Sequence, residues 1–193
     1  MEPFVRLNAV AMPLLRPNVD TDQIVPARYL QKPRSDNFGD YLFRDVRNDP
    51  AFVLNGEPYR GARIVVAERN FGCGSSREHA VWALHDYGFR AAIAPSFGDI
   101  FAGNALKNGF LPIVLPEATV TSLLAELTQR PGARLTIDLP RQVVRDMNGI
   151  EHAFEIDAFA KHCLIEGLDE ISFTLTHLPA IEAYEARLSK EMS

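Results

Sequence analysis

The sequence is poor in the residues that would build a metal site. Its 193 residues include only two cysteines, Cys73 and Cys163, and five histidines. A structural zinc or an iron–sulfur cluster takes three or four protein ligands, and two cysteines far apart in the sequence do not supply them. No two histidines have the spacing of metal ligands either. We therefore expect no metal site in this chain and infer that any metal used with it comes from elsewhere.

Long apolar runs and an excess of positive charge are also missing. No stretch approaches the roughly 20 apolar residues that span a bilayer, and the first six residues lack the regions of a secretory signal. The formal net charge is −5 at pH 7, whereas nucleic-acid binding favours a basic face. These absences predict no membrane and no nucleic-acid partner. Because two cysteines are too few for a disulfide framework, we expect a protein of the reducing cytoplasm.

What the chain does have is an ordinary globular composition, with 47% hydrophobic and 23% charged residues. No repeat, low-complexity segment or Ser/Gly linker divides it, so we expect one domain over residues 1–193. Residues 28–40 are polar and punctuated by proline and glycine. Long loops of this kind are often lids or binding loops. The sequence predicts a mobile loop there, with plain disorder as the alternative.

Apolar strands and amphipathic helices alternate in the middle of the chain. Such alternation predicts parallel strands joined by right-handed crossovers. Further on, Asn148-Gly149 between two apolar segments is a strong hairpin signal. We therefore expect a mixed sheet with helices packed outside it. The expected strands are 4–10, 63–67, 90–94, 111–115, 134–139, 143–146 and 150–156, and the later helices are 120–129, 158–166 and 180–190.

The most informative segment is Asn70–His79, which reads Asn-Phe-Gly-Cys-Gly-Ser-Ser-Arg-Glu-His. Gly72 and Gly74 permit the left-handed backbone with which successive N–H groups surround an anion. Arg77 places a cation in the first turn of the expected helix, where the helix dipole disfavours it. A bound carboxylate would remove that conflict. The segment therefore favours a site for a small carboxylate at the helix start.

Simpler interpretations of the same region stay open. Ser75 and Glu78 have the spacing of a capping box, which would only begin the helix. Cys73 lies near the helix start and is a candidate nucleophile, but no base is paired with it and a buried structural cysteine is the simpler alternative. Asp20 and Asp22 are either a carboxylate pair for acid–base chemistry or turn formers between prolines.

Longer blocks of the sequence resemble a known family. The Gly-Ser-Ser-Arg-Glu-His core of Phe71–Ala80 resembles the aconitase superfamily, and further blocks narrow the resemblance to the small subunit of bacterial 3-isopropylmalate dehydratase. It implies an α/β fold, namely a swivelling β/β/α domain of the aconitase type, with a mixed, barrel-like sheet and outer helices. The further blocks are Asp20–Leu30, Phe38–Phe43, Ala94–Phe101 and Asn104–Pro112.

The resemblance also implies an activity. The family isomerises 2-isopropylmalate to 3-isopropylmalate in leucine biosynthesis, by removing water and adding it again through isopropylmaleate. It implies a heteromeric hydro-lyase, inactive as the isolated chain, whose large subunit carries a 4Fe-4S cluster acting as Lewis acid. Close alternatives are small subunits of homoaconitate, citraconate or dimethylmalate hydratases. A non-catalytic carboxylate-binding module and a cysteine or serine hydrolase are alternatives of other classes.

The resemblance assigns roles to the residues of the turn. It maps the proton-abstracting base to Ser75 and a hydrogen bond to the substrate to Ser76. Arg77 and the N–H groups around Gly74 are expected to bind a substrate carboxylate and to stabilise developing negative charge. One conflict stays open, because a Ser75 hydroxyl tied to the N–H of Glu78 is poorly placed to take a proton. Either Ser76 is the helix N-cap or the cap opens.

Three residues outside the turn complete the expected site. The resemblance implies that Asp22 orients the active-site histidine or the cap region of the partner. Arg28 and Arg34, both on the 28–40 loop, are expected to take part in substrate binding by sensing the isopropyl group and closing the site.

Overall fold

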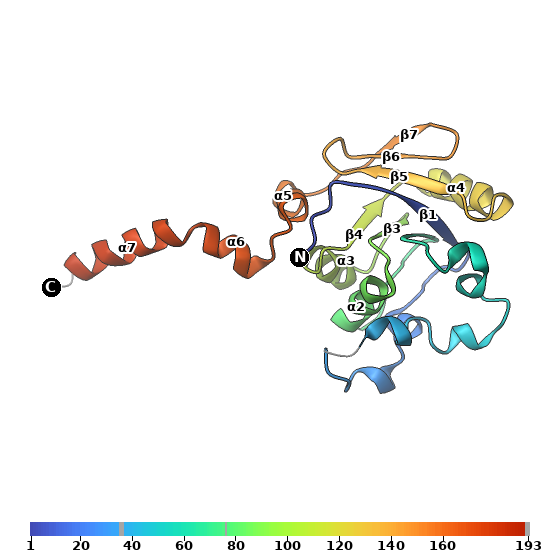
Figure 1. Cartoon of the computed structure of the whole chain (residues 1–193), viewed down its shortest axis with the longest axis horizontal. Coiled ribbons are helices and arrows are strands. Elements are labelled where there is room, and N and C mark those ends of the chain that lie inside the picture. Colours follow the sequence, from blue (N-terminus) through green and yellow to red (C-terminus); the bar gives the residue numbers. More distant parts are fainter. Residues whose placement is uncertain (35–36, 76, 192–193) are drawn as a thin grey trace.

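The computed structural model describes residues 1–34, 37–75 and 77–191. Within these residues the core is one seven-stranded mixed sheet, in the order β4-β3-β2-β1-β5-β6-β7. The parallel part comprises β1 (Arg6–Leu14), β2 (Ile64–Ala67), β3 (Ala91–Ala94) and β4 (Leu111–Val114). The antiparallel part comprises β5 (Arg134–Asp138), β6 (Val143–Arg145) and β7 (Glu151–Ala153). The predicted mixed sheet with outer helices is therefore confirmed (Figure 1).

Helices bury both faces of the parallel strands. α2 (Glu78–Tyr87) and α3 (Asp99–Lys107) are the crossovers of β2–β3 and β3–β4, and α4 (Glu117–Gln129) follows β4. Because side chains alternate along a strand, Val65 belongs to the core shared with α2 and α3, whereas Val66 belongs to the core shared with α4. The predicted crossover units are confirmed. No helix in the described part of the chain is long and apolar enough to cross a membrane.

The segment between β1 and β2 is built from short helical turns. These turns are α1 (Thr21–Ile24), η1 (Ala27–Tyr29), η2 (Phe38–Tyr41), η3 (Val46–Asn48), η4 (Val53–Asn55) and η5 (Glu57–Tyr59). Residues 28–40, expected as a mobile loop, thus contain parts of η1 and η2, and Phe38 is fully buried. Residues 35 and 36 lie outside the described part. The mobility of this loop stays a prediction.

Two elements differ from expectation near the ends of the chain. β1 continues to Leu14 through Pro13, whereas a strand ending at residue 10 was expected. β5 pairs with Arg6–Val10, and the Ala11 N–H donates the last hydrogen bond across this edge, to the carbonyl oxygen of Ala133. A proline at position 13 therefore removes no ladder hydrogen bond. The second difference is α6 (Glu170–Thr176), a helix that the sequence pattern does not predict.

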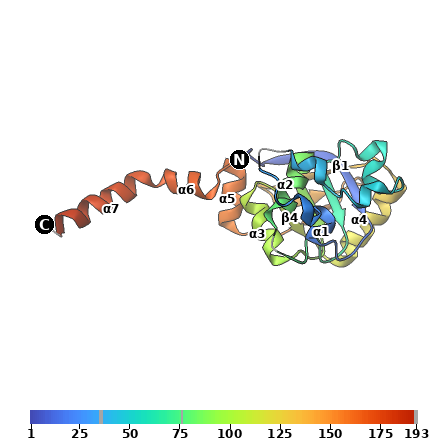
Figure 2. The same cartoon turned by 90° about the horizontal axis from the view of Figure 1, so that it is seen from below.

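The C-terminal helices form an arm. α5 (Ala158–Glu166) packs on the body with Asp157 as its N-cap, and α6 and α7 (Leu178–Glu191) then project away from it (Figures 1 and 2). The N-terminus lies near the root of this arm, and the C-terminus lies at its far end. The candidate site described below is therefore built from the body and not from the arm.

Candidate active site

The glycine turn lies where the carboxyl ends of three parallel strands meet. Segment 18–23 follows β1, segment 70–75 follows β2 and segment 96–98 follows β3. Two isolated bridges join them, between Asp20 and Cys73 and between Phe71 and Phe97. This edge of a parallel sheet is where α/β proteins generally bind ligands.

Backbone angles and close packing restrict the conformation of the glycine turn. Asn70, Gly72 and Gly74 have φ angles of 63°, 73° and 90°, so the left-handed backbone predicted for the two glycines is confirmed. A Cβ on Gly72 would lie 2.3 Å from the ring of Phe101, and one on Gly98 would lie 2.5 Å from the carbonyl oxygen of Gly72. Larger side chains at these two glycines would push the turn away from α3. The close packing fixes where the next residues emerge.

Ser75 is held through its backbone. The Thr21 hydroxyl donates to the carbonyl oxygen of Ser75 at 3.0 Å, and the Thr21 N–H donates to the carbonyl of Cys73, also at 3.0 Å. The Ser75 side chain is exposed at the surface of the turn. Thr21 was missed from the sequence, although it stands between the two aspartates considered there. It is 2% exposed and makes a contact across 54 residues.

The predicted capping box is wrong. α2 begins at Glu78, its N-cap is Arg77, and no side chain caps it. The Glu78 carboxylate instead accepts a hydrogen bond from the Asn108 amide at 2.8 Å. Ser75, whose carbonyl oxygen accepts the Thr21 hydroxyl, lies three residues before the helix, so its own hydroxyl is not required as a cap. The conflict between capping and proton transfer therefore disappears; Ser76 lies outside the described residues.

Arg77 is paired with one of the two predicted aspartates. Its side chain is 14% exposed, and its guanidinium donates to the carboxylate of Asp22 in the first turn of α1. Asp20 has a different task, because its carboxylate accepts the Gln23 N–H at 2.8 Å and caps α1. The predicted aspartate pair thus separates into a cap and an ion-pair partner. Arg77 lies at the N-cap and not inside the first turn, where it was expected.

Arg28 and Arg34 lie in ion pairs of their own. Arg28 pairs with Asp45, whose hydrogen bonds raise the pKa of the guanidinium. Arg34 donates two hydrogen bonds to Asp86, at 2.8 and 2.9 Å, and lies over the ring of Trp82. Among the described residues neither arginine contacts Ser75 or Arg77. Their roles in substrate binding stay predictions.

Cys73 does not have the environment of a nucleophile. Burial, with a smaller contribution from the charge of Asp20, raises the pKa of its thiol. Reactive cysteines need the opposite shift. His79 is half-buried against the rings of Phe38 and Trp82, and burial lowers the pKa of its imidazole. Both residues favour the structural interpretation, and a cysteine hydrolase has no support here.

The structure brings four of the predicted site residues together, and their role in binding a carboxylate stays a prediction. Ser75, Gly74, Arg77 and Asp22 are brought together by β1, β2 and the start of α2. Within residues 1–34, 37–75 and 77–191, no three His, Cys, Asp or Glu side chains gather in a way that could hold a metal ion.

Two family models match different parts of this chain. The family described as Aconitase C-terminal domain matches residues 1–118, and the family described as LeuD_N matches residues 121–158. The 3-isopropylmalate dehydratase small subunit of Saccharophagus degradans is 49% identical over 205 residues, covering 98% of this chain and 95% of that protein. The protein of the same name from Methylibium petroleiphilum is 52% identical over 201 residues, covering 96% and 93%.

A solved structure shares the fold. The crystal structure of 3-isopropylmalate dehydratase (leuD) from Methanocaldococcus jannaschii superposes with a TM-score of 0.69 at 26% sequence identity. The match covers 93% of this chain and 99% of that chain. The expected aconitase-type fold is thereby confirmed.

Proposed function

Because this chain belongs to the family of 3-isopropylmalate dehydratase small subunits, we propose that its glycine turn supplies the proton-transfer and carboxylate-binding side of a shared active site. Relatives 49% and 52% identical over almost the whole chain support the family. The chain is a subunit of a hydro-lyase of leucine biosynthesis, which isomerises 2-isopropylmalate to 3-isopropylmalate. Water leaves to give isopropylmaleate and is added again at the neighbouring carbon.

Ser75 is proposed as the base of the dehydration step. Its Oγ takes the proton from the carbon next to a carboxylate, and the electron pair of the C–H bond forms the C=C bond. The neighbouring carbon releases its hydroxyl as hydroxide, which becomes water by taking a proton from an acid that we place on the large subunit. A serine is a weak base by itself and needs a site that stabilises its alkoxide. The Gly72 N–H is already used by the carbonyl oxygen of Val19, at 2.7 Å, so we assign this role to Arg77 and to the N–H groups later in the left-handed turn, around Gly74.

Arg77 is proposed to bind a substrate carboxylate. Its guanidinium has five N–H donors in a rigid fork, and the contact with Asp22 uses one of them through Nη1. The remaining donors are suited to a second, bidentate contact with a carboxylate. Because the side chain is largely buried, that contact is shielded from water and gains strength.

The rest of the active site is proposed to lie on the large subunit. The described residues of this chain do not fit a 4Fe-4S cluster, because no three potential ligands gather. We therefore place the cluster on the partner, where it would supply the Lewis acid for the leaving hydroxyl. Ser76, Arg28 and Arg34 are proposed as further substrate contacts, and Asp22 as the contact to the partner's active-site region. A cytoplasmic enzyme fits the free thiols of Cys73 and Cys163.

The observation that carries the proposal is the position of Ser75 beside the Arg77–Asp22 pair, with no part in capping α2. The test is Ser75→Ala in the full chain, reconstituted with the large subunit and assayed with 2-isopropylmalate. We expect kcat to fall by about 10²–10⁴-fold, the range of general acid–base catalysis. Subunit association, followed by size-exclusion chromatography, should not change, because the alanine keeps the backbone contacts of Thr21.

The matched control is Ser172→Ala on the arm, which should retain wild-type kcat. Turnover of Ser75→Ala at the wild-type rate would show that another group takes the proton. Parallel assays with homoaconitate, citraconate and dimethylmalate define the substrate. Higher kcat/KM for one of these than for 2-isopropylmalate would reassign it.

A further inference from the structure

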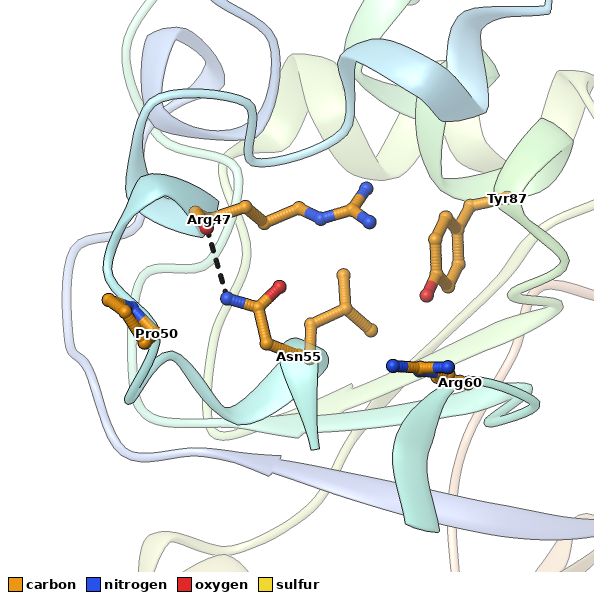
Figure 3. Close-up of a pocket in the computed structure, with 6 residues that line it drawn as sticks. Arg47, Pro50, Asn55, Arg60 and Tyr87 are labelled. Carbon is orange, nitrogen blue, oxygen red and sulfur yellow. Dashed lines mark hydrogen bonds between the residues drawn. The ribbon is translucent and has the colours of Figure 1, made fainter. Parts of the chain in front are cut away.

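A polar cavity lies at the C-terminal end of α2, away from the glycine turn. It measures about 670 Å³ and is shown in Figure 3. Tyr87 is the last residue of α2, whereas Arg77 precedes its first. At a rise of about 1.5 Å per residue, the ten-residue helix keeps the two regions roughly 15 Å apart. The cavity is therefore not part of the site at the glycine turn. Its lining residues are Arg47, Pro50, Leu54, Asn55, Arg60 and Tyr87.

Two guanidinium groups face this cavity, and its lining contains no carboxylate. Arg47 is half-buried, with its Cζ 5.4 Å from the centroid of the Tyr87 ring. Among the described residues Arg47 has no ion-pair partner within 4.0 Å. Arg60 pairs at 2.7 Å with Glu57, but both side chains of that pair are more than two-thirds exposed. Since such an exposed pair contributes little free energy, Arg60 can exchange Glu57 for an anionic ligand at small cost, and Arg47 has no carboxylate among the described residues to give up.

The other polar groups of the cavity are held in place. The Asn55 amide nitrogen donates to the carbonyl oxygens of Arg47, at 3.0 Å, and Asp49, at 2.9 Å. Both amide hydrogens are thereby used, which leaves the amide oxygen of Asn55 directed into the cavity (Figure 3). The nearby Asp49 carboxylate accepts the Ala51 N–H at 2.9 Å and is occupied in its own turn. The Tyr87 hydroxyl faces the same space.

We propose that this cavity binds a small dianion, either a dicarboxylate or a phosphate, through Arg47 and Arg60. Guanidinium groups match the paired oxygens of both anions, and a dianion removes the repulsion between the two arginines. The Asn55 amide oxygen accepts a hydrogen bond from a hydroxyl on the ligand, which favours a hydroxylated anion. Binding at this cavity requires neither the large subunit nor the chemistry at Ser75.

The test is calorimetric titration of the full chain at constant ionic strength, once with inorganic phosphate and once with succinate. Every titration uses the Arg77→Gln background, so that the glycine turn does not contribute. We expect saturable one-to-one binding with a Kd of about 1 mM or tighter. In Arg47→Gln and Arg60→Gln the Kd should rise about tenfold or more, because each removes a charge-assisted contact. Malate, compared with succinate, tests the contact of Asn55 with a ligand hydroxyl.

The matched control is Arg6→Gln, which makes the same charge change on the exposed start of β1 and should leave the Kd unchanged. Circular dichroism of each variant verifies folding. Binding of phosphate alone or of succinate alone identifies the class of dianion. No binding of either anion, or equal weakening by Arg6→Gln and Arg47→Gln, would overturn the assignment.

Discussion

Arg77 joins the end of the glycine turn to α1 through its ion pair with Asp22. Arg77→Lys keeps the charge but loses the rigid fork, so it cannot hold Asp22 and a substrate carboxylate together. We expect KM for 2-isopropylmalate to rise by about 30-fold, equivalent to about 2 kcal/mol, the value of a charge-assisted hydrogen bond. Steady-state kinetics of the reconstituted enzyme measure the change.

Arg69→Lys is the control for that experiment. Arg69 is exposed, and its nearest carboxylate, on Glu117, is 3.9 Å away. Its replacement should change neither kcat nor KM. If Arg77→Lys also left both constants unchanged, Arg77 would have no part in substrate binding.

Single residues also show where sequence reasoning succeeds. The left-handed Gly72 and Gly74 and the Asp157 cap were predictable, because each depends on the conformation of a few neighbouring residues. The capping box predicted at Ser75, in contrast, is wrong. Arg77 is extended, with φ −140° and ψ 105°, and is the N-cap of α2, while the Ser75 carbonyl accepts a hydrogen bond from Thr21, 54 residues earlier. Contacts between distant segments leave no local pattern.

At the scale of elements, the β6–β7 hairpin depends on one buried carboxylate. Asp146 accepts hydrogen bonds from the N–H groups of Asn148, at 2.8 Å, and Ile150, at 2.9 Å, and its other oxygen lies 3.1 Å from the His152 ring. Burial by itself raises the pKa of Asp146. The bonds from Ile150, His152 and Asn148 outweigh burial and hold the pKa below its usual range.

Asp146→Ala should lower the free energy of unfolding by about 1–3 kcal/mol at pH 7, because it leaves buried N–H groups unpaired. The part of this difference that comes from ionisation is present above the unfolded pKa of about 3.9 and is lost as the pH falls through the lower folded pKa. Urea unfolding at pH 7 and near pH 3 therefore should show a smaller difference between wild type and variant in acid. A larger difference in acid would contradict the role of the ionised carboxylate.

Elements were predictable in proportion to their burial. The crossover helices and parallel strands bury one face or both, so their periodicity is visible in the sequence. α6 is the opposite case, because Ile171 is 74% exposed and Leu175 is 57% exposed. A short helix without a buried face has no periodic signal. The final residues of β1 were missed for another reason. Proline is rare inside strands, so Pro13 obscured the strand signal up to Leu14.

At the scale of the whole molecule, the arm and the body are separable. α6 touches the body through an exposed pair between Lys107 and Glu170 at 2.9 Å, and through edge-to-face contacts of the Phe173 ring with Phe159 and His162 of α5. Ending the chain after Leu168 should therefore keep the thermal midpoint within about 4 °C, since about 1 kcal/mol shifts the midpoint of a domain of this size by roughly 2–4 °C.

Scanning calorimetry of the truncated and full chains makes this comparison. The truncated chain should also show one cooperative transition, because the sheet and its helices remain. A fall of ten degrees or more would show that the arm belongs to the folding unit of the body.

The ion pair between Asp22 and Arg77 also affects how strongly Arg77 attracts carboxylates from solution. Because Asp22 belongs to the same chain, its carboxylate competes with free carboxylates for Arg77 at a constant, high local concentration. A dicarboxylic acid that enters the glycine turn shares the guanidinium with Asp22 and meets a reduced net positive charge there.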